Sequence, residues 1–78
     1  MGRILFGRDK LAEAAEHFQK AVHLKPDFPE AHNNFGVLLA RQGKVREAVD
    51  QYRQALELRP GYGKARINLE AALSQRGQ

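Results

Sequence analysis

The fold of this chain is decided by residues 29–62, which read PEAHNNFGVLLARQGKVREAVDQYRQALELRPGY. This stretch aligns without a gap to the sequence on either side of it at an offset of 34 residues. The offset pairs identical or similar residues, namely Glu13 with Glu47, Ala14 with Ala48, Phe18 with Tyr52, Ala21 with Ala55, Leu24 with Leu58, Pro26 with Pro60, Phe28 with Tyr62, Ala31 with Ala65, Asn34 with Asn68, Phe35 with Leu69, Leu39 with Leu73 and Gly43 with Gly77. Self-similarity at this period, carried by two amphipathic segments, indicates a repeat protein built from helix-turn-helix units.

The apolar spacing predicts where the helices lie. Positions three, four and seven residues apart are apolar from Leu11 to Val22, from His32 to Leu39 and from Val45 to Leu56, as on one face of a helix. Pro26 and Pro60 are expected to stop helices, and Gly43 to form a tight turn. We therefore expect helices at about 11–25, 29–42, 45–59 and 64–76, with Phe18, Phe35, Leu39, Tyr52, Leu56 and Leu69 as the best-buried large side chains. Residues 2–7 are expected to be the end of an earlier helix that stops at Gly7-Arg8-Asp9.

The residues that define the unit also carry a resemblance. Asn33-Asn34-Phe35-Gly36, Gly43, Glu47-Ala48, Tyr52, Ala55-Leu56 and Pro60 stand where the tetratricopeptide repeat family has its signature positions. The chain resembles the C-terminal part of an array of that family. The resemblance implies an all-α fold of antiparallel helix-turn-helix repeats, stacked as a short right-handed α-solenoid with a C-terminal capping helix. It implies a single domain over residues 1–78, with a partial repeat at 1–28, a full repeat at 29–62 and the capping helix at 63–78.

The last helix departs from the repeat pattern in a way that predicts its role. Glu70 stands at the position of Gly36, and Arg66 stands at the position of the large ring of His32. A charged face cannot accept a following helix, whereas Leu69 and Leu73 still provide apolar contacts to the preceding repeat. This is the pattern of the polar-faced helix that closes a solenoid.

Composition argues against several classes of protein. The formal net charge is +4, but the 13 Lys and Arg are interspersed with 9 acidic residues, so we expect no nucleic-acid partner. No apolar run is long enough to span a membrane, and there is no cysteine, so we expect no membrane insertion of this segment and a cytoplasmic location.

Catalytic and metal-binding residues are scarce. The chain has no Thr or Cys, and its one serine, Ser74, has no histidine near it in sequence, so we do not expect an enzyme. His17, His23 and His32 fall on different helices or faces, which argues against a metal site, and no cofactor is expected.

A stripe of side chains that the packing pattern leaves free is the candidate binding site. The resemblance implies that the first helix of each repeat lines a concave groove. The groove is then expected to contain Asn33, Asn34, Val37, Arg41, Lys64, Ile67, Asn68 and Ala71, with Glu30 and Gln75 at its ends. Asn34 and Asn68 hold the same repeat position, and each can both donate to and accept from a peptide backbone. They resemble the asparagine ladder of some family members.

Two functions remain open from the sequence. The first is a protein-interaction module that binds an extended peptide or a partner protein in the groove. The second is a structural module that self-associates as a homodimer through its N-terminal end, where Ile4, Leu5 and Phe6 form an apolar run too compact for one narrow helical stripe. A monomer in which the N-terminal residues fold back on the second helix is the competing arrangement.

Overall fold

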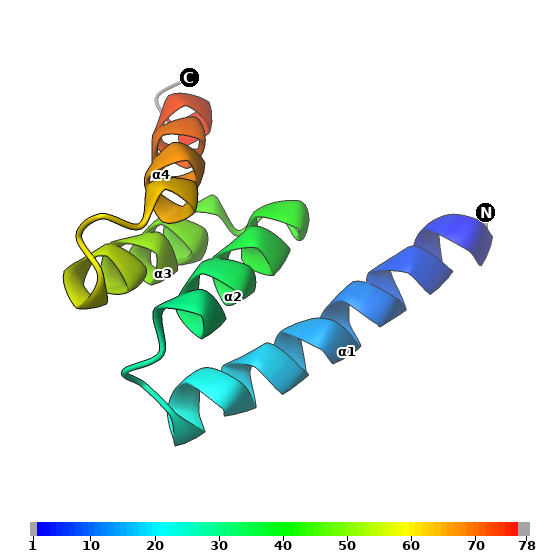
Figure 1. Ribbon diagram of the computed structural model, residues 1–78. Helices are drawn as coiled ribbons and strands as arrows, with labels where there is room; N and C mark the ends of the chain where they lie inside the picture. Colours follow the sequence, from blue (N-terminus) through cyan, green and yellow to red (C-terminus); the bar gives the residue numbers. More distant parts are fainter. Residues whose placement is uncertain (1, 77–78) are drawn as a thin grey trace.

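The protein consists of four α-helices joined by short turns (Figure 1). The computed structural model describes the backbone of residues 2–76 and the side chains of residues 10–75. The helices are α1 (Gly2–Leu24), α2 (Pro29–Arg41), α3 (Val45–Leu58) and α4 (Gly63–Arg76). The described residues contain no strand, so the predicted all-helical fold is confirmed.

Each helix packs mainly against its neighbours in sequence. Helix α2 packs on α1 and α3, α3 packs on α4, and a smaller contact joins α2 to α4, whereas no contact joins α1 to α3 among the described residues. In Figure 1 the N-terminal half of α1 stands away from the other three helices. The arrangement is that of stacked helical hairpins, in which α2 and α3 form the central one.

The core lies between α2, α3 and α4. Its buried members are Phe35, Leu39, Ala48, Val49, Tyr52 and Ala72. Of the six large side chains expected to be best buried, Phe35, Leu39 and Tyr52 are buried, while Phe18, Leu56 and Leu69 are half-buried. Phe18 is half-buried because, among the described residues, α1 packs against α2 alone. Burial also raises the pKa of the Tyr52 hydroxyl.

Gly36 sets the distance between α2 and α3. A Cβ built on Gly36 would stand 2.5 Å from Cε1 and 2.8 Å from Cδ1 of Tyr52. Separations that short do not occur between packed carbon atoms, so only glycine lets the Tyr52 ring lie against the α2 backbone. The signature glycine is therefore a packing requirement of the hairpin.

The turn between α2 and α3 requires a second glycine, Gly43. Gly43 has a φ of 83°, in the left-handed region that side chains other than glycine rarely adopt. The Lys44 amide donates to the Leu39 carbonyl at 2.8 Å, and the Gly43 amide donates to the Ala40 carbonyl at 3.0 Å. These bonds satisfy the last carbonyl groups of α2 and reverse the chain.

The predicted break at Gly7-Arg8-Asp9 is wrong, because α1 is one continuous helix from Gly2 to Leu24. The residue equivalent to Gly43 in the earlier repeat is Asp9, and its Cβ disfavours the positive φ that the turn needs. Gly7 stands two residues too early to replace it. A helix that continues instead keeps its backbone hydrogen bonds.

Candidate functional site

Most of the predicted groove residues are exposed on α2 and α4. Asn34, Arg41, Lys64, Ile67 and Ala71 are exposed, and Ile67 reaches 68%. Asn68 and Val37 are half-buried, and Val37 packs in part against the core. We call the exposed residues of this set, together with Asn68, the groove face.

Asn33 is the exception to the predicted stripe, because it is 4% exposed and is not free. The Asn68 amide donates to the Asn33 side-chain oxygen at 2.9 Å. The bond joins α2 to α4 directly. Asn33 therefore fixes the two helices of the groove face relative to each other, and the sequence prediction that it lies open in the groove is wrong.

Asn34 and Asn68, which hold equivalent repeat positions, consequently differ in their hydrogen bonding. The Asn68 amide donates to Asn33 of the preceding repeat. Asn34 is exposed, and among the described residues its side chain makes no hydrogen bond. A ladder of two identical free amides is not present in this conformation. Asn34 alone offers its full set of donors and acceptors to a ligand.

Glu30, expected at one end of the groove, belongs to a cluster in which the start and the end of the full repeat meet. Its carboxylate lies 2.9 Å from the Arg59 guanidinium, which also stands 5.2 Å from the centroid of the Tyr62 ring. A hydrogen bond from the backbone amide of Glu30 lowers the pKa of this carboxyl, and Arg59 lowers that pKa further. Sequence reasoning missed Arg59, because Glu30 lies at the start of α2 and Arg59 lies just after α3, so no local spacing in the sequence indicates the pair.

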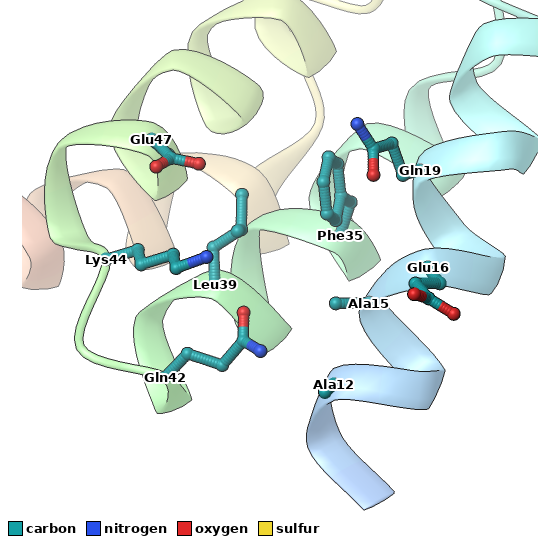
Figure 2. Close-up of a pocket in the computed structure, with 9 residues that line it drawn as sticks. All are labelled: Ala12, Ala15, Glu16, Gln19, Phe35, Leu39, Gln42, Lys44 and Glu47. Carbon is teal, nitrogen blue, oxygen red and sulfur yellow. The ribbon is translucent and has the colours of Figure 1, made fainter. Parts of the chain in front are cut away.

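A crevice of about 300 Å³ lies between α1 and the hairpin of α2 and α3, with Phe35 and Leu39 at its base (Figure 2). Its remaining lining residues are Ala12, Ala15, Glu16, Gln19, Gln42, Lys44 and Glu47. Among the described residues the backbones of α1 and α3 do not approach each other closely, and the crevice lies between them. No sequence signal predicted it, since the distance between these two helices is a tertiary property.

His32 has a structural role. Its Nε2 donates to the Pro26 carbonyl oxygen at 2.7 Å, and its Nδ1 forms a 2.8 Å hydrogen bond with the Gln51 side chain. The ring is 3% exposed, and it connects the turn before α2 to the middle of α3. Among the described residues there is no group of three or more His, Cys, Asp or Glu side chains placed to hold a metal ion.

The predicted self-association residues Ile4, Leu5 and Phe6 lie outside the described side chains. Their role in a homodimer stays a prediction.

Comparison with known families agrees with this geometry. The sequence model of the family described as TPR repeat matches residues 2–43, and that of the family described as tetratricopeptide repeat matches residues 29–62. The chain belongs to the tetratricopeptide repeat family. The second match covers the hairpin of α2 and α3 with the turns that flank it. Comparison with the curated proteins finds no match.

Members of this family share a general role. Tetratricopeptide repeats are in general protein-protein interaction modules of a non-catalytic family. None of the helices, as far as they are described, is long and apolar enough to cross a membrane.

Proposed function

We propose that this tetratricopeptide chain binds an extended segment of a partner protein along the groove face of α2 and α4. The observation that supports this proposal best is the Asn33–Asn68 hydrogen bond, which ties the two helices together beneath an exposed surface. A surface fixed before binding loses little conformational entropy when a ligand arrives. The outward side chains of the groove face are not part of the hydrophobic core.

The chemistry of the groove face suits a peptide. Asn34 has a free amide that can bond a peptide backbone in both directions. Ile67, at 68% exposure, offers apolar contact area to a ligand side chain. Arg41 and Lys64 are exposed cations without an ion pair among the described residues, so they are free to contact a ligand.

The test is selection of extended peptides from a random library on the 78-residue chain, followed by measurement of Kd by fluorescence anisotropy. Asn34→Ala should weaken the binding of a selected peptide by about 0.5 to 1.5 kcal/mol for each hydrogen bond lost. Ile67→Glu should weaken it further, since a charge replaces the apolar contact. Asn68→Ala is less informative alone, because it also removes the bond to Asn33.

Gln54→Glu is the matched control for the groove variants. Gln54 is exposed on α3, and this substitution changes the net charge by the same amount as Ile67→Glu. The control should bind selected peptides with the parent affinity. A selected peptide whose affinity is unchanged by Ile67→Glu and Asn34→Ala, with the helical content intact, contradicts the proposal.

A further inference from the structure

The chain builds the same turn twice, once before α2 and once before α4. In the first turn the Phe28 amide donates to the Lys25 carbonyl oxygen at 3.3 Å, and in the second the Tyr62 amide donates to the Arg59 carbonyl oxygen at 3.0 Å. Phe28 is 52% exposed, whereas Tyr62 is half-buried. The backbone bonding is alike, but the side chains around the two turns differ.

A histidine connects the first turn to the helices beside it. His32 of α2 donates to the Pro26 carbonyl oxygen through Nε2 and bonds the Gln51 side chain of α3 through Nδ1. The repeat offset of 34 places Arg66 at this position in α4. Arg66 is exposed and lies 3.7 Å from Glu70 of its own helix. Arg66 therefore does not provide for α4 the connection that His32 provides for α2.

Arg59 makes a corresponding connection at the second turn. Its guanidinium lies 2.9 Å from the Glu30 carboxylate at the start of α2, and 5.2 Å from the centroid of the Tyr62 ring just before α4. Arg59 itself follows the last residue of α3. One side chain thus connects the start of α2, the end of α3 and the start of α4. Lys25, the equivalent residue of the first turn, forms no ion pair among the described residues.

Helix α4 fully buries little large apolar surface that could hold its position. Its buried residues are small, namely Ala65 at 0% and Ala72 at 3% exposure, and Leu69 and Leu73 are half-buried. In a repeat protein each unit is held by contacts with its neighbours. The side-chain contacts of Arg59 at the first turn of α4 therefore matter to where this helix lies.

We propose that Arg59 is a positioning residue of the groove face, which holds the first turn of α4 against the start of α2 without itself contacting the partner segment. This inference rests on the proposed function, because α2 and α4 form the groove face together. Lys64 and Ile67 belong to the start of α4. Loss of the Arg59 contacts releases this part of α4, and the groove face is then no longer assembled.

The distance between α3 and α4 can be measured directly. The chain has no cysteine, so pairs of cysteines can be introduced and spin-labelled. Gln54→Cys on α3 and Ser74→Cys on α4 are both at exposed positions, and the distance between their labels reports how α4 lies on the hairpin. Gln19→Cys on α1 with Gln54→Cys is the control pair, because Arg59 does not connect α1 to α3. Double electron-electron resonance gives the distribution of each distance.

Arg59→Gln should add a second population to the α3–α4 distance and leave the α1–α3 distance unchanged. The released fraction should rise about three- to thirtyfold, the combined effect of an exposed ion pair and a cation–π contact. Arg59→Lys keeps a cation beside Glu30 and should restore the parent distribution. Arg53→Gln makes the same change at an exposed position of α3 that has no ion pair among the described residues, and should have no effect.

A peptide selected on the groove face extends the test to binding. Such a peptide contacts both α2 and α4, so at saturation it should return the distribution of Arg59→Gln to that of the parent. If Arg59→Gln releases α4 but no peptide reverses the release, the proposed groove is wrong while the role of Arg59 in placing α4 holds.

Two results overturn the inference about Arg59. One is an α3–α4 distance distribution that is identical in the parent and in Arg59→Gln. The other is weaker peptide binding by Arg59→Gln while α4 stays docked, since Arg59 would then contact the peptide itself.

Discussion

At the scale of single residues, the glycines of this chain are required for different structural reasons, which the sequence does not distinguish. Gly36 is required because the Tyr52 ring leaves no space for a Cβ, whereas Gly43 is required because its backbone has a positive φ. A Cβ built on Gly63 would meet no atom within 4 Å. Space and backbone conformation thus predict different outcomes for the same substitution.

Gly36→Ala is expected to destabilise the protein. The added methyl group must displace Tyr52, which is 3% exposed and cannot move freely, and overpacking of this kind costs about 1 to 3 kcal/mol. The better helix propensity of alanine offsets roughly 1 kcal/mol of that cost. Urea denaturation followed by circular dichroism should therefore give a lower midpoint for Gly36→Ala and an unchanged or higher one for Gly63→Ala. If Gly36→Ala were at least as stable as the parent, the α2–α3 contact would be misplaced.

At the scale of the helices, the turn chemistry decides whether two helical segments form a hairpin or one long helix. Gly43 closes the α2–α3 hairpin through hydrogen bonds to Ala40 and Leu39. Asp9 stands at the same repeat position, and there α1 continues. The two outcomes coincide with different residues at this position, glycine in the hairpin and aspartate in the continuous helix.

Gly7→Ala tests the continuity of α1. Within a helix, replacement of glycine by alanine stabilises by about 1 kcal/mol, so Gly7→Ala should raise the helical content and the Tm. If Gly7 instead belonged to a turn between two helices, the substitution would lower the Tm. Gly43→Ala is the control, because alanine at a φ of 83° is strained and should lower the Tm. Circular dichroism at 222 nm during thermal unfolding gives both readings.

At the scale of the whole molecule, a few side-chain bonds connect residues distant in sequence, some between repeats and some within the full repeat. Asn33 bonds Asn68 between α2 and α4, and Glu30 pairs with Arg59 between the start of α2 and the end of α3. His32 connects the turn at Pro26 to α3. The Asn33–Asn68 bond joins the full repeat to α4, and so connects the two helices of the groove face, whereas the Glu30–Arg59 pair joins the two ends of the full repeat.

The pH dependence of unfolding should report on Glu30. Its pKa in the folded protein is below the ordinary value of 4.5, so the unfolded chain binds more protons at acidic pH. The resulting stabilisation is fully present above about pH 4.5 and is lost as the pH falls through the lower, folded pKa. We expect the Tm of the parent to fall as the pH is lowered below about 4.5, and we expect this fall in Tm to be smaller for Glu30→Gln. The control is Glu57→Gln, at an exposed position of α3, whose Tm should fall with pH as much as that of the parent. If the Tm of Glu30→Gln falls equally, Glu30 does not contribute to the pH dependence.

Much of the fold follows from local sequence patterns. The helical periodicity, Pro26 and Pro60, and Gly43 predicted α2, α3 and α4 to within a residue or two, because these signals act through neighbouring backbone atoms. The signature residues of one repeat were enough to indicate the family. The exposed members of the groove face followed from the same periodicity, since residues that do not point at the core of a helical hairpin point to solvent.

The tertiary structure alone decided how the helices meet. The sequence showed Asn33 and Asn34 as neighbours on one stripe, but the approach of α4 buries Asn33 and leaves Asn34 exposed. It showed Ala14 and Ala48 as equivalent, but only Ala48 is enclosed by two helices. Periodicity states which side of a helix is apolar, and it does not state how many neighbours cover that side. That number depends on contacts between residues far apart in the chain, and among the described residues it leaves Ala14 half-buried where Ala48 is fully buried.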